Sequence, residues 1–161
     1  MNAATEAEIR RGTGWVVAQF VLMGVIIAAA FLPPRWPDGV RVPLFVVGAI
    51  LVGLGLGLVV WAARTMGSLL TPFPKPASDG RLVVDGPFAI VRHPVYLGGI
   101  LLFAGIALMT SLPALAVTFV LALLWHGKAQ VEERHLRARF PEYTAYAGRV
   151  RSSIPPLRAR R

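Results

Sequence analysis

The sequence predicts an all-α integral membrane protein with about four transmembrane helices, and two of its properties carry that prediction. Hydrophobic residues make up 55% of the chain and charged residues only 16%, with a mean hydropathy of +0.61. Such a composition leaves too few polar side chains to cover a soluble domain. The apolar residues also form three blocks that contain no charged residue: 15–32, 42–63 and 95–126.

The first two blocks each have the length of one membrane span. As helices, residues 15–32 and 42–63 would measure about 27 and 33 Å, close to a hydrocarbon core of about 30 Å. Arg10 and Arg11 before the first block also suit a cleavable signal peptide, but the apolar run is long for one. We therefore expect the first block to be retained as a helix.

Small residues repeat along the second block. Ala49, Gly53 and Gly57 are spaced four residues apart and so share one helical face. Faces of small residues let membrane helices approach closely. We expect this face to pack against another membrane helix; it does not suit a nucleotide-binding loop, because no strand precedes it.

The third block is too long for one span. A single helix over 95–126 would measure about 48 Å, and Pro113 interrupts it. Proline starts helices well and interrupts them badly. The sequence therefore predicts a helical hairpin that turns near Pro113, with arms 95–110 and 113–126, the second able to continue past His126 into water.

Basic residues lie almost entirely on one side of a four-span arrangement. The net charge is +9, and of the 17 basic residues only Arg35 and Arg41 fall between the first and second spans. The positive-inside rule then predicts a cytoplasmic (inner) membrane protein with both termini in the cytoplasm. Because these cations flank apolar spans, the bilayer explains them, and we expect no nucleic-acid partner.

The remaining polar sequence falls into two segments. Residues 64–94 are rich in proline and glycine and predict an ordered or re-entrant loop. Residues 127–161 predict a C-terminal cytoplasmic amphipathic helix. The whole chain, 1–161, is expected to be one membrane domain, with an N-terminal two-helix part (1–63) and a second part (64–161) that carries the chemistry.

The hairpin has a chemical consequence. It brings the segment from Arg92 to Tyr96 to the same membrane face as Glu132, although about forty residues separate them. Ionisable groups at a membrane boundary are costly, which makes their convergence a candidate functional site. Each also has a simpler explanation: Arg92 as a membrane anchor, Tyr96 in an aromatic belt, and Glu132 in a surface ion pair with Lys128.

Other chemistries have weaker support. The chain has no cysteine, which excludes disulfides, thiolate metal sites and a cysteine nucleophile. Glu132 and His135 have the spacing of half a di-iron motif, but a second such motif is missing, so we expect no metal. His93 has no nucleophile-elbow context for serine hydrolysis.

These motifs resemble those of the isoprenylcysteine carboxyl methyltransferase family and its bacterial relatives. The resemblance covers about residues 64–157 and rests on the segment 82–98 with its Arg-His-Pro-x-Tyr element, on Glu132-Glu133-Arg134, and on the segment 140–146. It implies S-adenosylmethionine as the cofactor, without a Rossmann fold. The methyl acceptor would be lipophilic or small and would reach the site from the bilayer.

Site residues also follow from the resemblance, position by position. Glu132 would bind the cofactor from the returning helix, and Lys128 stands where relatives present an arginine to the substrate. The other cofactor-binding residues would be Leu82, Val83, Phe88, His93, Pro94, Val95 and Tyr96. Two alternatives stay open: a membrane reductase of related fold that uses NADPH, and a non-enzymatic membrane scaffold.

Overall fold

The computed structural model describes residues 3–74 and 81–150, with side chains from residue 12 onward. Its long helices are α1 (Ala3–Ala29), α2 (Asp38–Met66), α3 (Pro94–Thr110) and α4 (Leu112–Arg139), followed by the short α5 (Tyr143–Arg149). Two 3-10 turns, η1 (Gly67–Leu69) and η2 (Gly86–Ala89), interrupt the segment between α2 and α3. No strand occurs in the described ranges, so the predicted all-α class is confirmed.

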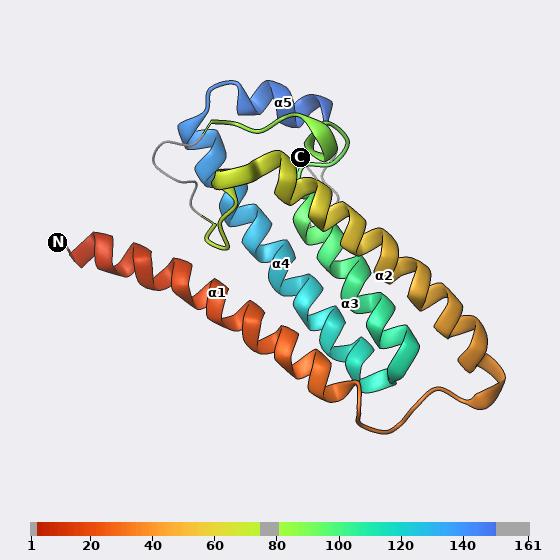
Figure 1. Ribbon diagram of the computed structural model, residues 1–161. Coiled ribbons are helices and arrows are strands. Elements are labelled where there is room, and N and C mark those ends of the chain that lie inside the picture. The colour runs from red at the N-terminus through yellow and green to blue at the C-terminus, as the bar shows by residue number, and fades with distance from the viewer. Residues whose placement is uncertain (1–2, 75–80, 151–161) are drawn as a thin grey trace, which may run out of the picture.

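The four long helices form a single bundle in which neighbours along the chain are not always neighbours in space. Helix α2 packs on α3, α3 on α4, and α4 on α1. Figure 1 shows this order across the bundle, from α1 on the left to α2 on the right. Helices α1, α2 and α4 are long and apolar enough to cross a membrane, and α3 is a shorter apolar helix of 17 residues. The chain is an integral membrane protein.

The predicted hairpin is confirmed, and its turn is very tight. Helix α3 ends at Thr110 and α4 begins at Leu112, so Ser111 alone joins them. The Ser111 hydroxyl accepts a hydrogen bond from the Ala114 amide at 3.4 Å and donates one to the Ala29 carbonyl at 2.7 Å. One side chain thus caps α4 and ties the hairpin turn to the end of α1.

The α1–α2 connection lies beside that turn. Leu112 N–H donates to the Pro34 carbonyl at 3.3 Å, and Trp36 Nε1 donates to the Ala107 carbonyl at 3.2 Å. Both helix–helix turns therefore share one end of the bundle. Residues 67–74 and 81–93, the last turns of α4 and helix α5 lie together at the opposite end, which we call the polar end (Figure 1).

The second span packs against another helix as predicted, but within the chain the predicted small-residue face does not make that contact. Ala49, Gly53 and Gly57 are exposed. The contact is made instead by Gly48 and Gly55, where an added Cβ would lie 2.6 and 2.5 Å from carbonyl oxygens of α3. Those carbonyls belong to residues that are glycines themselves: Gly105 and Gly98. The two backbones touch, and no side chain fits between them.

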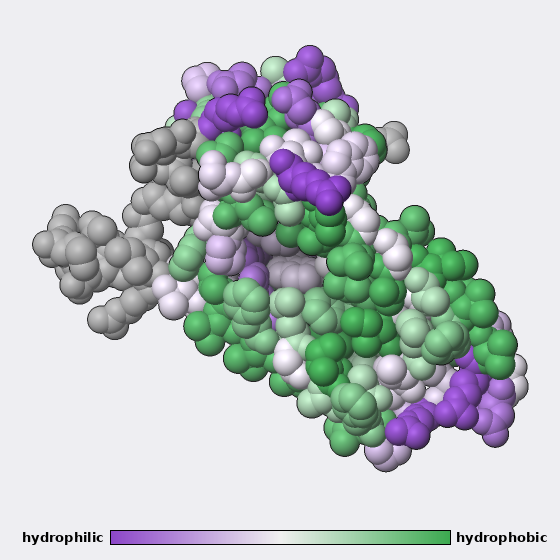
Figure 2. All heavy atoms as spheres, viewed as in Figure 1, coloured by the Kyte–Doolittle hydropathy of each residue, from purple (hydrophilic) through white to green (hydrophobic). Residues whose placement is uncertain are grey.

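Most of the outer surface of the bundle is apolar, as a bilayer requires. Figure 2 shows apolar residues over most of the long helices and polar residues gathered at the two ends. On this face the apolar surface is interrupted near the polar end by a hollow whose floor is less apolar than its rim. The charge-rich sequence after His126 continues α4 as one helix to Arg139, past the apolar part of the bundle.

Candidate functional site

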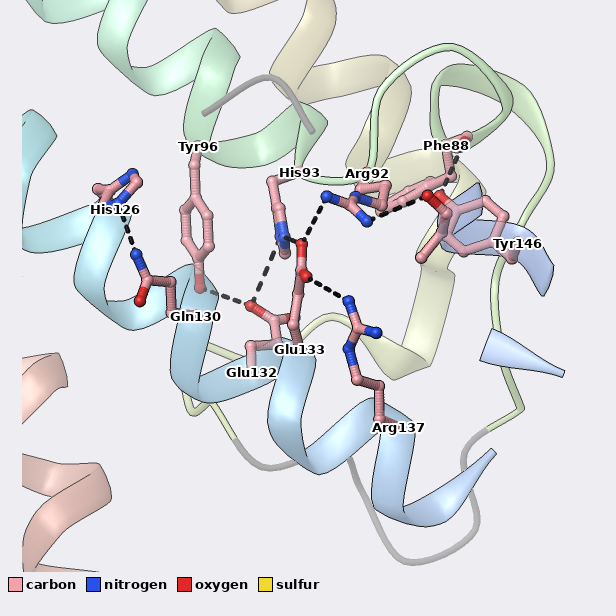
Figure 3. A network of polar contacts seen from close by, with 11 residues as sticks. Phe88, Arg92, His93, Tyr96, His126, Gln130, Glu132, Glu133, Arg137 and Tyr146 are labelled. Carbon is pink, nitrogen blue, oxygen red and sulfur yellow. Dashed lines mark hydrogen bonds and ion pairs between the residues drawn. The ribbon is translucent and has the colours of Figure 1, made fainter. Parts of the chain in front are cut away.

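The polar end contains a network of charged and aromatic side chains between α3 and α4. Figure 3 shows Tyr96 and His93 pointing from the start of α3 toward Glu132 and Glu133 on α4. The Tyr96 hydroxyl donates to Glu132 Oε2 at 2.9 Å, and His93 Nε2 contacts Glu133 Oε1 at 3.1 Å. The predicted convergence of the two sequence motifs is therefore what the fold produces.

The two neighbouring glutamates have different surroundings. Glu133 forms ion pairs with Arg92 at 3.2 Å and with Arg137 at 3.3 Å, in addition to its contact with His93. Glu132 bonds to Tyr96 and lies 4.0 Å from His93 Nδ1, and its side chain keeps 28% exposure. The contacts of Glu133 are therefore structural. Glu132 can still accept further hydrogen bonds beyond those it forms with the described residues.

Stacked rings support the α3 side of the network. The His93 and Tyr96 rings stack with centroids 5.6 Å apart, and Tyr96 stacks on Trp125 at 5.8 Å. Trp125 lies directly against α3, because a Cβ added at Gly99 would lie 2.5 Å from its ring. Stacking on these two rings fixes the Tyr96 ring, and with it the hydroxyl that reaches Glu132.

The loop before α3 is anchored by a glycine turn. Gly86 has φ +57°, and an added Cβ there would lie 2.8 Å from the Thr65 hydroxyl on α2. Only glycine meets both requirements. The turn places Phe88 in η2, and its carbonyl accepts a 2.7 Å hydrogen bond from the Tyr146 hydroxyl of α5. Burial raises the pKa of Tyr146 to about 12, so this hydroxyl stays protonated at neutral pH.

Two adjoining cavities open among these elements. The first, which we call the α5 cavity, is lined by Leu82, Val83, Phe88 and Glu132 together with Tyr143 and Tyr146 of α5. The second, the α3 cavity, is lined by His93, Pro94, Val95, Tyr96 and again Phe88 and Glu132. Both are also lined by Met66 and Arg92. Every residue predicted to bind a cofactor therefore lines one cavity or both.

Lys128 lies next to the site but is bonded on its other side. Its side chain is 1% exposed, and its ammonium donates to the Gln19 side chain of α1 and, at 2.6 Å, to the Pro72 carbonyl. The ammonium also lies 5.6 Å from the centre of the Tyr96 ring. Within the described ranges Lys128 lines neither cavity. To contact a substrate, as predicted, its ammonium would have to give up its bond to Gln19 or to the Pro72 carbonyl.

Several cavity residues were missed by the sequence analysis as site residues. Arg92 and Tyr143 each line the α5 cavity, and Arg92 Nε and Tyr143 Oη are buried without a hydrogen-bond partner among the residues that the structure describes. Both were part of the motifs that carry the family resemblance. The signal that could have found Tyr143 is its spacing from Tyr146, which puts two tyrosines on one helical face.

Glu132 and His135, considered above as half of a metal motif, face different spaces. Glu132 lines the two cavities, whereas His135 lines a separate groove with Trp15 and Pro74. His135 Nδ1 also bonds to the Val131 carbonyl at 2.9 Å, one turn back in α4.

Comparison with known proteins identifies the family of the chain. The family model described as phospholipid methyltransferase matches residues 43–143, from α2 to the start of α5. The chain belongs to the phospholipid methyltransferase family. The match includes the hairpin, every residue that lines the α3 cavity and every residue that lines the α5 cavity except Tyr146. Together with the isoprenylcysteine O-methyltransferase relative below, it confirms the resemblance inferred from the sequence motifs.

Individual relatives extend the comparison. The chain is 30% identical over 152 residues to the cobalt-zinc-cadmium resistance protein CzcN of Cupriavidus metallidurans, covering 92% of this chain and 64% of the relative. It is 34% identical over 114 residues to protein-S-isoprenylcysteine O-methyltransferase B of Arabidopsis thaliana, covering 67% of this chain and 57% of the relative. The chain thus spans less than two thirds of the length of either protein.

Proposed function

We propose that the chain transfers a methyl group from S-adenosylmethionine to a lipophilic or small acceptor at the cytoplasmic face of the membrane. The observation that carries this proposal is the pair of cavities that meet at Glu132, lined by every residue assigned to the cofactor from the sequence. Membership of a methyltransferase family supports the same chemistry.

The side chains around the cavities fit such a cofactor. Leu82, Val83 and Phe88 offer apolar surface for its adenosine portion. Glu132 offers a carboxylate with free acceptor capacity for its amino or hydroxyl groups. The ring of Phe88, which lines both cavities, offers a face that attracts a sulfonium cation. These side chains therefore suit a ligand that has a cationic sulfur and a flat nucleobase.

In the proposed reaction, S-adenosylmethionine supplies the methyl group, whose bond to sulfur breaks as the bond to the acceptor forms. The chain contributes mainly position, because this transfer requires the acceptor atom, methyl carbon and sulfur to lie nearly in line. Glu132 holds the cofactor side, and its hydrogen bond with Tyr96 fixes the carboxylate. The Arg92–Glu133–Arg137 ion pairs hold the loop and α4 in register.

The membrane arrangement supports access from two directions. The polar end, with α5 and the loop before α3, would face the cytosol, from which a water-soluble cofactor arrives. A lipophilic acceptor would enter sideways from the bilayer, and apolar residues such as Leu70 and Val95 line the α3 cavity. The acceptor and the orientation are parts of the proposal, as is a role for Lys128 toward the acceptor.

Calorimetric titration of the purified protein in detergent with S-adenosylhomocysteine tests this function. We expect wild type to bind with micromolar affinity, and Glu132→Gln to weaken binding about ten-fold or more, since it removes a charge from the hydrogen bond. His93→Ala should also lose binding. Glu142→Gln is the matched control, because Glu142 is an exposed glutamate at the same polar end of the bundle.

The same preparation distinguishes the rival functions. Thermal stabilisation by NADPH but not by S-adenosylhomocysteine would replace the proposal with a membrane reductase. Stabilisation by neither ligand, with tolerance of alanine at His93 and Glu132, would indicate a scaffold. Either outcome in well-folded protein would overturn the methyltransferase assignment.

A further inference from the structure

Two buried hydrogen-bond donors have no partner in the described part of the chain, the Tyr143 hydroxyl and Arg92 Nε. Both belong to residues that line the α5 cavity. A buried polar group without a partner costs about 1–3 kcal/mol. Tyr143 is 1% exposed, so water does not satisfy it from outside. Two such donors on residues that line one cavity are what a ligand with acceptor atoms would satisfy.

The rest of the Tyr143 surroundings show why its hydroxyl is available. Its ring packs against Tyr146 with centroids 5.7 Å apart and lies under the Arg137 guanidinium at 5.6 Å. These contacts hold the ring and leave the hydroxyl unused. Tyr146, one turn later, is different, because its hydroxyl already donates to the Phe88 carbonyl.

Arg92 is similarly divided between structure and cavity. Its two terminal nitrogens are engaged: Nη2 pairs with Glu133 at 3.2 Å, and Nη1 donates to the Ala147 carbonyl at 3.4 Å. These two bonds fix the guanidinium between α4 and α5 and leave Nε–H as a spare donor (Figure 3). The guanidinium is therefore a fixed cation rather than a mobile side chain.

The α5 cavity is lined by charges of both signs. Arg81 and Arg92 contribute positive charge and Glu132 contributes negative charge. Burial raises the pKa of Tyr143, so its hydroxyl is a neutral donor at physiological pH. A ligand with an ammonium and a carboxylate on one carbon would match both signs of charge.

We infer that Tyr143 and Arg92 bind the α-carboxylate of the cofactor's amino-acid portion, while Glu132 receives its ammonium group. The inference rests on the proposed function and adds the anchor at the end of the cofactor remote from the methyl group. It assigns α5, a helix of seven residues, a direct part in cofactor recognition. Tyr143 acts here as a binding residue and takes no part in bond making.

Tyr143→Phe and Tyr146→Phe are the matched variants, because each removes one hydroxyl from the same helix. The test measures binding of S-adenosylhomocysteine and of its decarboxylated analogue, which keeps the amine and lacks the carboxylate. Wild type should bind the carboxylated ligand about ten-fold more tightly or better, as expected for hydrogen bonds to a charged group. Tyr143→Phe should lower affinity for that ligand and leave affinity for the analogue unchanged.

The control variant and the unliganded protein complete the test. Tyr146→Phe should change the affinity for both ligands by the same factor, because its hydroxyl bonds to the chain. Without ligand, Tyr143→Phe should melt at or above the wild-type temperature, since it removes an unpaired buried hydroxyl, whereas Tyr146→Phe should melt lower.

The outcomes separate this inference from the proposed function. If wild type binds S-adenosylhomocysteine but prefers it no more than the analogue, the carboxylate anchor is wrong and the methyltransferase proposal stands. Equal weakening of both ligands by Tyr143→Phe, or no weakening, has the same meaning. If wild type binds neither ligand, both the function and the anchor are overturned.

Discussion

The Tyr96 hydroxyl on α3 and the Glu132 carboxylate on α4 meet at 2.9 Å, although 36 positions separate them in the chain. Tyr96 is fixed by stacking on His93 and Trp125, so it presents its hydroxyl in one direction. Glu132 is thereby held at the border of the two cavities, while its other oxygen has no hydrogen bond to the described residues. This contact links the hairpin to the site, because it forms only when α4 returns beside α3.

A double-mutant cycle on this pair should reveal strong coupling. Tyr96→Phe should lower the free energy of unfolding in detergent by about 1.5–3 kcal/mol, the range for a hydrogen bond to a charged group. In the Glu132→Gln background the same change should cost clearly less. Equal costs in both backgrounds would mean that the two side chains do not interact in the folded protein. Thermal or denaturant unfolding followed by circular dichroism measures all four proteins.

The glycine contact between α2 and α3 predicts a position-specific effect. Gly55→Ala places a methyl group 2.5 Å from the Gly98 carbonyl, so the helices must separate. We expect a loss of about 1–3 kcal/mol from this overpacking. Gly53→Ala is the matched control on the same helix, since an added Cβ there meets no described atom within 4 Å. It should be neutral or slightly stabilising, and similar melting temperatures for the two variants would contradict the packing.

We expect Lys128 to stabilise the folded protein, whether or not it also contacts the acceptor. Lys128→Met removes the hydrogen bond to the Pro72 carbonyl, which should loosen the chain around Pro72. It should lower the free energy of unfolding by about 1–3 kcal/mol. Limited proteolysis and thermal unfolding measure both effects. Arg134→Met removes an exposed cation from the same helix and serves as control. If Lys128→Met were as stable as this control and raised only the KM for the acceptor, Lys128 would act on substrate alone.

The absence of cysteine allows a direct test of membrane orientation. Gly39→Cys places a thiol at the α1–α2 end, and Glu142→Cys places one at the polar end, both at exposed positions. The positive-inside rule predicts labelling of the first, and not the second, by a membrane-impermeant maleimide in intact cells. Disrupted cells should label both. The reverse pattern would place the polar end, and the site, outside the cytoplasm.

The hairpin and the grouping of site residues could be predicted from the sequence because they depend on chain-local signals. An uncharged block too long for one span must turn, and Pro113, now in the first turn of α4, indicated where. Once the turn is known, the ends of its two arms must meet. The residues assigned to the cofactor then line the same two cavities, whereas Lys128 lines neither.

Contacts between helices distant in the chain could not be predicted in the same way. The spacing of four among Ala49, Gly53 and Gly57 indicated a packing face, but Gly48 and Gly55 are seven apart, as are Gly98 and Gly105. That matching spacing of two helical turns was present in the sequence and was the better signal. The bond of Lys128 to Gln19 had none, because it depends on how α1 packs against α4.

Transfer of a labelled methyl group tests the central claim most directly. Membranes from cells that produce the protein are incubated with S-adenosylmethionine carrying a tritiated methyl group, and label in the organic-soluble fraction is counted. Membranes containing wild type or Glu142→Gln should accumulate label, and those with equal amounts of Glu132→Gln should not. Label that is no higher for wild type than for Glu132→Gln would contradict a methyltransferase site at Glu132.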